Sequence, residues 1–134
     1  MTPDTLYPEI LWSVEAAQDK QAGNITVLKL TGAFADYFLL CTGESTPQLQ
    51  AISDAIEEKL GRKGVRLEHR EGKIGAEWVL LDYGSFVVHI FSERAREYYG
   101  LERLWRTGER LDFPTGARAS PPPRAESESG APQP

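Results

Sequence analysis

Cysteine and histidine are scarce in this chain of 134 residues, and its 15 Lys and Arg are outnumbered by 20 Asp and Glu. The single cysteine, Cys41, cannot form a disulfide within the chain, nor can it supply an all-cysteine metal site. Two histidines without a cysteine pair also argue against a zinc site. We therefore expect no metal and no cofactor, and cysteine usage of this kind suits a reducing cytoplasm.

Long apolar runs are absent as well. No stretch of the sequence approaches the roughly 18 apolar residues that a membrane span needs. The first residues, Met1–Asp4, lack the basic start and apolar run of a signal peptide. We expect a cytoplasmic protein that does not contact a membrane.

An excess of positive charge is missing too, because the net charge is −5. Non-specific affinity for nucleic acid comes largely from Lys and Arg that release counterions from phosphates. We therefore expect no direct reading of nucleic acid, and an RNA-binding module remains an alternative that the charge disfavours. A basic protein would instead be attracted to this chain by its opposite charge.

The apolar residues that are present, 40% of the chain, suffice for one compact core. Their periodicity predicts helices and strands in the following order: helix 8–23, strands 24–30 and 36–42, helix 46–60, strands 65–70, 77–83 and 86–91, helix 93–99, and a last turn at 101–105. This order predicts an α/β fold whose mixed sheet has about five strands, two main helices and a short C-terminal helix. Two helices cannot easily cover both faces of such a sheet, so we expect part of one face to stay open.

The composition changes near residue 107. Prolines, serines, alanines and glutamates dominate the last segment, and no apolar periodicity remains after Phe113. We predict a single domain over residues 1–106 and a disordered tail over 107–134.

One strand pattern combines a large apolar residue with a carboxylate. Alternation along residues 77–83 places Trp78, Leu80 and Asp82 on one face of the sheet. An apolar anchor beside an anionic point is suited to gripping a basic protein surface. In the alternative interpretation, Trp78 and Leu80 simply fill a core under a helix.

Aromatic residues gather again near the end of the predicted domain. Tyr99 and Trp105 could pack the last helix onto the sheet, or they could contact a partner. Glu102 and Arg103 are expected to form solvated ion pairs that contribute little to stability.

A nucleotide-binding enzyme is the main alternative to a binding module. The segment Thr42–Ser45 precedes a predicted helix capped by Thr46, and backbone N–H groups at such a place can bind phosphate. Nucleotidyltransferases, however, also need two metal-binding carboxylates spaced one residue apart on a strand. No predicted strand contains such a pair, and neither a Walker loop nor a GxGxxG motif is present. These patterns favour a small acidic binding module without catalytic residues.

Three blocks of sequence, in the right order, together resemble one known family. They are residues 36–46 (DYFLLCTGEST), residues 77–91 (EWVLLDYG followed by VVHIF) and residues 96–105 (REYYGLERLW). They are similar to the "ADYF…TGxST", "EWVLLDYG…VVHxF" and "REFYxLExLW" blocks of the RsfS, or Iojap/YbeB-like, ribosome silencing factors. The resemblance covers roughly residues 8–106.

This resemblance implies a non-enzymatic function. Members of the family bind a large-subunit ribosomal protein at an intersubunit bridge, block association of the subunits and so repress translation. The resemblance also implies a nucleotidyltransferase-like fold without catalytic carboxylates, and a homodimer when the protein is free of the ribosome. The residues of this chain that match the family's ribosomal-protein-binding surface are Trp78, Leu80, Asp82, Tyr99 and Trp105.

Overall fold

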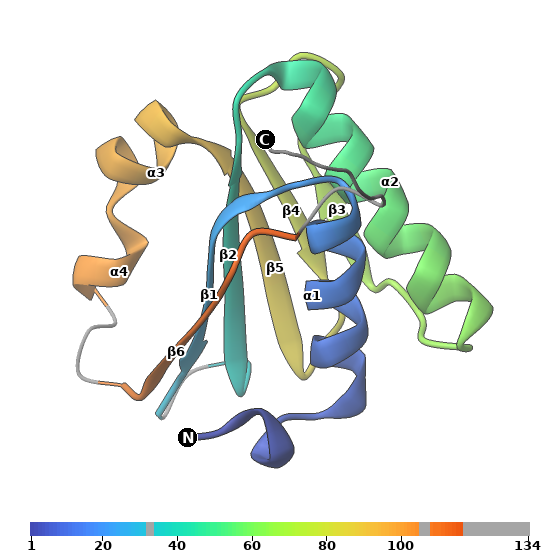
Figure 1. The fold of residues 1–134 in the computed structure, drawn as a ribbon, viewed down its shortest axis with the longest axis vertical. Helices are drawn as coiled ribbons and strands as arrows, with labels where there is room; N and C mark the ends of the chain where they lie inside the picture. Colours follow the sequence, from blue (N-terminus) through green and yellow to red (C-terminus); the bar gives the residue numbers. More distant parts are fainter. Residues whose placement is uncertain (32–33, 105–107, 117–134) are drawn as a thin grey trace, which may run out of the picture.

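The computed structural model describes residues 1–31, 34–104 and 108–116. Its elements, in chain order, are a 3-10 turn (η1), four α-helices and six strands (Figure 1): η1 (Pro3–Thr5), α1 (Pro8–Asp19), β1 (Gly23–Lys29), β2 (Tyr37–Gly43), α2 (Thr46–Arg62), β3 (His69–Glu71), β4 (Trp78–Asp82), β5 (Phe86–Ser92), α3 (Glu93–Tyr99), α4 (Leu101–Leu104) and β6 (Arg110–Phe113). The predicted α/β class with a mixed sheet is confirmed.

The six strands form one sheet in the order β3-β4-β5-β2-β1-β6. Only β2 and β5 are parallel neighbours, and every other pair is antiparallel. All seven residues of β2 are buried, as its nearly continuous apolar sequence predicts for a central strand.

Helices α1 and α2 pack together on one face of the sheet, to the right in Figure 1. The buried residues of α2 recur at helical spacing, and they join those of α1 and the inward residues of the strands in the main core. The predicted cap of α2 was wrong by one residue. Ser45, rather than Thr46, accepts the hydrogen bond from the Gln48 N–H, at 3.2 Å, because Thr46 is already helical.

Helices α3 and α4 lie on the opposite face, beside only part of the sheet (Figure 1). A second, smaller core forms there from strand side chains that point away from α1 and α2, together with Ala95 and Leu101. The short helices leave much of this face without a helix over it, as the helix count predicted.

Arg96 fixes the two short helices to the sheet. Its side chain is only 9% exposed and pairs with Glu102, at 2.9 Å, while it also donates to the Asn24 carbonyl and to the Thr26 hydroxyl. Glu102 also pairs with Arg110 on β6. The expectation that Glu102 forms a solvated ion pair was therefore wrong, because it closes a partly buried network that joins α3, α4, β1 and β6.

Two strands differ from the predictions. The strand predicted over 65–70 is reduced to β3, because residues 65–68 make no ladder beyond the bond from Glu68 N–H to Asp82 O. The sheet has six strands rather than about five, since β6 pairs with β1. This strand lies in the segment predicted as a tail, so the sheet continues past residue 106.

Candidate functional site

Strand β4 presents alternate side chains to the two faces of the sheet. Val79 and Leu81 are fully buried toward α2, whereas Trp78, Leu80 and Asp82 are half-buried on the other face. We call these three side chains the β4 face. The alternation that predicted their common orientation is confirmed, and α3 reaches this face through Tyr99.

Trp78 is held in an aromatic cluster. Its indole ring lies 4.5 Å from the Tyr99 ring and 5.1 Å from the Phe91 ring, measured between centroids. The indole N–H donates a 3.1 Å hydrogen bond to Nδ1 of His89. Neighbouring side chains therefore fix the position and orientation of the Trp78 ring, which nevertheless remains partly exposed to solvent.

Tyr99 extends this apolar surface onto α3. Its side chain is 48% exposed, and the neighbouring Tyr98 is 78% exposed. The two tyrosines line an open cavity of about 530 Å³, together with Ala95 and Arg94. A sequence comparison of α3 with β4 could not have predicted that Tyr99 contacts Trp78, because the pairing depends on how α3 folds back over the sheet.

The Asp82 carboxylate forms a hydrogen bond within the chain and is also partly exposed to solvent. One carboxylate oxygen accepts the Gly84 N–H at 2.8 Å and so caps the turn to β5. Gly84 has a φ of +88°, which glycine adopts without strain. The hairpin therefore fixes the carboxylate at the end of the β4 face.

Polar side chains of the edge strand β3 border the same face. The register pairs His69 with Asp82 and Glu71 with Leu80. His69 and Glu71 are exposed and contact each other. The β4 face is thus an apolar centre with carboxylates along its rim.

His89 supports the β4 face from beneath, as a hydrogen-bonded structural histidine of the kind that its place in an apolar strand indicates. It is 3% exposed beneath Trp78 and Leu80, its ring lies 4.5 Å from that of Phe38, and burial lowers the pKa of the imidazole to about 3. A neutral ring whose Nδ1 accepts from Trp78 carries its proton on Nε2, and Nε2 has no hydrogen-bond partner among the described residues. A histidine within an otherwise apolar strand was the available signal, but its partner depends on the β4–β5 register.

The remaining predicted site residue, Trp105, lies outside the described residues. Leu104 immediately before it is 72% exposed, while Leu101 packs against the smaller core. The structure therefore brings together four of the five predicted residues: Trp78, Leu80, Asp82 and Tyr99.

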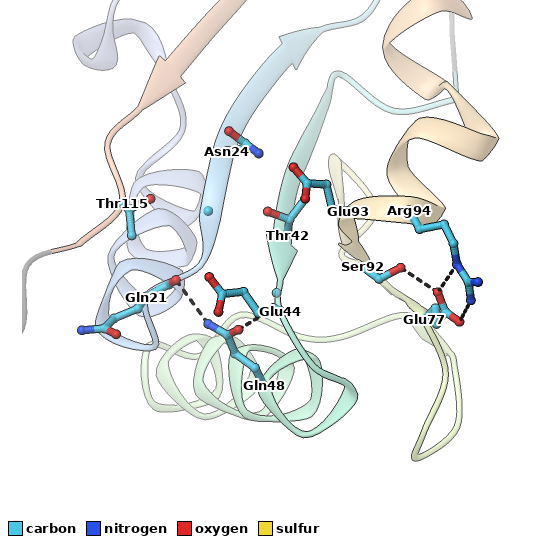
Figure 2. Close-up of a pocket in the computed structure, with 12 residues that line it drawn as sticks. Gln21, Asn24, Thr42, Glu44, Gln48, Glu77, Ser92, Glu93, Arg94 and Thr115 are labelled. Atoms are coloured by element: carbon cyan, nitrogen blue, oxygen red, sulfur yellow. Dashed lines mark hydrogen bonds and ion pairs between the residues drawn. The ribbon is translucent and has the colours of Figure 1, made fainter.

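The predicted phosphate-binding segment opens into a second site at the C-terminal ends of β2 and β5. A cavity of about 550 Å³ lies there, and we call it the acidic cavity (Figure 2). Its lining residues are mainly polar or charged: Gln21, Gly23, Asn24, Thr42, Gly43, Glu44, Gln48, Glu77, Ser92, Glu93, Arg94 and Thr115.

Two backbone N–H groups at this helix start, those of Glu44 and Gln48, are already engaged. The Gln48 side chain accepts from the Glu44 N–H, at 2.6 Å, and Ser45 accepts from the Gln48 N–H. Ser92, which caps α3, donates to Glu77. Carboxylates at the rim and occupied donors together disfavour a phosphate ligand.

Among the described residues, Glu77 is the carboxylate of the acidic cavity that has a cationic partner. Arg94 pairs with it, and Ser92 donates to it at 2.8 Å (Figure 2). These bonds, that of Arg94 first, hold the pKa of Glu77 below its usual range, and the same contact raises the pKa of Arg94.

Neither site has the composition of a metal centre. Within residues 1–31, 34–104 and 108–116, no group of three or more His, Cys, Asp or Glu side chains could hold a metal ion. Across the same residues, no helix has the length and hydropathy to cross a membrane.

A family profile described as "Ribosomal silencing factor during starvation" (RsfS) matches residues 3–133, nearly the whole chain. This chain belongs to the RsfS family. The curated ribosomal silencing factor RsfS of Bacillus subtilis is 41% identical over 103 residues, which are 75% of this chain and 87% of that protein.

Solved structures of similar proteins share the fold of this RsfS family member. A protein from Bacillus halodurans has a TM-score of 0.68 and 36% identity, covering 78% of this chain and 96% of its own. One from Chromobacterium violaceum has a TM-score of 0.70 and 32% identity, covering 83% of this chain and 93% of its own. The resemblance found in the three sequence blocks is thus confirmed.

Membership of the RsfS family makes this chain a ribosomal silencing factor. The family comprises regulatory proteins rather than known enzymes. A regulatory role of this kind directs attention to surfaces that could bind a partner, such as the β4 face.

Proposed function

We propose that this protein binds a basic protein of the large ribosomal subunit through the β4 face and Tyr99, with Trp105 from the following segment. Bound there, it occupies an intersubunit bridge, keeps the small subunit from joining and so represses translation. It acts by steric occlusion in the cytoplasm, without catalysis, a cofactor or direct reading of RNA.

The observation that carries this proposal is the environment of Trp78. The indole is oriented by His89 and by aromatic neighbours, among them Tyr99 of α3, yet it stays partly exposed. Tryptophans that are held in place beside a partly open surface are typical anchors of protein interfaces. Family membership supports the ribosome as the target of this anchor.

Charge supports a basic partner. The net charge of the chain is −5, and Asp82 and Glu71 border the β4 face. Carboxylates around an apolar centre favour encounter with a positive surface and disfavour approach to the phosphate backbone of ribosomal RNA.

An interface of ordinary size would explain the silencing. About 1,200–2,000 Å² of total buried surface suffices for a specific complex. The β4 face, Tyr98, Tyr99 and Leu104 lie on or beside one side of the sheet and would form part of such an interface. We extend the proposal to a homodimer of the free protein, supported by the exposed apolar side chains of Phe34, Tyr98 and Leu104.

Replacing Trp78 by alanine tests the proposal. The wild-type protein should co-sediment with purified large subunits and, when added before mixing, reduce the amount of joined ribosomes on a sucrose gradient. Trp78→Ala should weaken binding to large subunits by about 2 kcal/mol or more, because an anchor aromatic is lost. Subunit joining should then be restored at concentrations where the wild type blocks it.

Trp12→Ala provides the matched control. Trp12 lies on α1, packs on the opposite side of the sheet and has Lys63 Nζ 4.9 Å from its ring centroid. Truncating it removes the same side chain from outside the β4 face, and binding should stay at the wild-type level. Urea unfolding shows whether each variant is folded. A folded Trp78→Ala protein that binds and blocks joining normally would refute this assignment.

A further inference from the structure

The chain beyond β6 starts from a fixed point at the rim of the acidic cavity. Gln18, at the end of α1, donates from its side chain to the Pro114 carbonyl at 2.9 Å. Gly116 lies so close to Gln18 that an added Cβ would come within 2.2 Å of the Gln18 carbonyl oxygen. Thr115, between these two contacts, lines the acidic cavity. Residues 117–134, which lie outside the described residues, therefore begin beside this cavity.

An aromatic groove adjoins the acidic cavity on its far side. It is the open cavity of about 530 Å³ beside α3, which we call the tyrosine groove. The rings of Tyr98 and Tyr99 line it, 5.1 Å apart and nearly perpendicular. The ion pair of Glu77 with Arg94 lines both cavities, and in Figure 2 this pair lies across the acidic cavity from Thr115. Grooves lined by exposed aromatic rings are typical binding sites for proline-rich segments.

The segment that follows Gly116 has the matching sequence. Residues 121–123 are three successive prolines, which favour the polyproline II conformation. Aromatic grooves bind such segments because an extended proline run loses little conformational entropy on docking. Residues 117–124 also contain two arginines, Arg118 and Arg124, and no acidic residue. The segment is therefore basic and proline-rich, whereas the surface beside it is acidic and aromatic.

Reach and charge fit a path across the cavity. Pro121 is the fifth residue after Gly116, and five extended residues span about 16 Å, whereas a cavity of about 550 Å³ is on the order of 10 Å across. On this path Arg118 passes the carboxylates of Glu44 and Glu93, which form no ion pair within the described part of the chain. Opposite charges would thus meet over the cavity before the prolines arrive at the groove.

We propose that residues 117–124 cross the acidic cavity of their own molecule and place the prolines 121–123 in the tyrosine groove. A tether this short gives an effective concentration in the millimolar range, so weak contacts between prolines and tyrosines suffice. Tyr99 lines the groove and also contacts Trp78, so a docked tail would cover part of the proposed ribosome-binding surface. The tail is then an autoinhibitory segment, a consequence that rests on the proposed function, whereas the docking itself does not.

A spin label attached to Ser127→Cys in the full chain tests the docking. Cys41, the only native cysteine, is fully buried, so the label should attach to the introduced thiol alone. A label three residues beyond Arg124 lies beside the groove when the prolines are docked. We expect it to broaden the amide resonances of Tyr98 and Tyr99 strongly.

Two changes should remove this broadening. Serine in place of all three prolines keeps the length and charge of the tail, and it should reduce the broadening about threefold or more. Tyr98→Ser should do the same, because it removes one wall of the groove, and its ring, 78% exposed, adds little to folding. Phe34→Ser is the matched control. Its ring is 76% exposed but lies before β2, at the opposite end of that strand from the acidic cavity, so broadening should stay at the wild-type level.

A mixed sample separates docking within one molecule from docking between copies. It combines an isotope-labelled chain that has no spin label with a spin-labelled chain that has no isotope label. Broadening in the mixture as strong as in the single chain would overturn docking within one molecule. The proposal also fails if neither the three serines nor Tyr98→Ser reduces the broadening.

Co-sedimentation with large subunits tests the autoinhibitory role. The variant with three serines should bind about threefold more tightly than the wild type, as expected if the tail covers the surface about two-thirds of the time. Equal affinities would overturn autoinhibition. If the wild type bound no subunits at all, the proposed function would fail, while the result from the spin label would still decide whether the tail docks.

Discussion

His89 controls the orientation of Trp78 at the scale of single residues. Its Nδ1 accepts the indole N–H at 3.1 Å, and its ring packs between the aromatic rings of Phe38 and Phe91. A leucine at this position fills a similar volume but has no nitrogen that could accept the hydrogen bond from the indole N–H of Trp78. We expect His89→Leu to weaken binding to large subunits by about 1 kcal/mol, the typical contribution of one hydrogen bond, in the co-sedimentation assay.

His89→Gln distinguishes orientation from general packing. The glutamine carbonyl can accept from the Trp78 indole, so this variant should recover binding that His89→Leu loses. If both variants bound equally well, the hydrogen bond would have no part in presenting Trp78.

Strand β6 shows what a short element contributes. Its four residues pair with β1 from Leu28 to Ile25, and Leu111 and Phe113 pack against the main core. A chain ending at Glu109 should therefore be about 2 kcal/mol less stable than one ending at Gly116, since two half-buried apolar side chains are lost. Urea unfolding of the two truncated chains measures this difference. Equal midpoints and slopes would show that β6 adds no stability.

The same strand marks the limit of sequence-based prediction. The apolar pattern of the sequence located α2, β2 and β4. Helix α2 buries side chains at helical spacing, β2 is buried along its whole length, and β4 alternates between buried and half-buried residues. Residues 110–113 contain only two apolar side chains, and their partner on β1 is more than 80 residues away. Pairing that depends on distant residues, like the contact of Tyr99 with Trp78 and that of His89 with Trp78, leaves little signal in local sequence. The common orientation of the β4 face could be predicted from the sequence, but the contacts of Tyr99 and His89 that hold Trp78 in place could not.

At the scale of the whole molecule, the buried imidazole makes stability depend on pH. Burial lowers the pKa of His89 to about 3, whereas an unfolded histidine titrates near 6.5. Between these values the unfolded chain binds a proton that the folded chain does not, so the free energy of unfolding rises with pH. This contribution is fully present above pH 6.5 and is lost as the pH falls toward 3. We expect the wild type to be about 2 kcal/mol less stable at pH 5 than at pH 7.

Urea unfolding at the two pH values tests this dependence. His89→Gln has no imidazole at this position and should show a much smaller difference between pH 5 and pH 7. His69→Gln is the control, since it removes the other histidine from an exposed site on β3 and should leave the wild-type difference in place. An unchanged difference in His89→Gln would mean that other groups cause it.

The two outer strands of the sheet have a consequence for assembly. One border is β3, which has only three residues, all with ionisable side chains, and the other is β6, which has four and is followed by Pro114. Short, charged borders and a following proline disfavour the addition of a further strand from another chain. Continuation of the sheet from molecule to molecule, which leads to fibres and aggregates, is thereby discouraged. If self-association and ribosome binding both use the face that carries the β4 face, as proposed above, a second copy and a ribosomal partner would compete for the same surface.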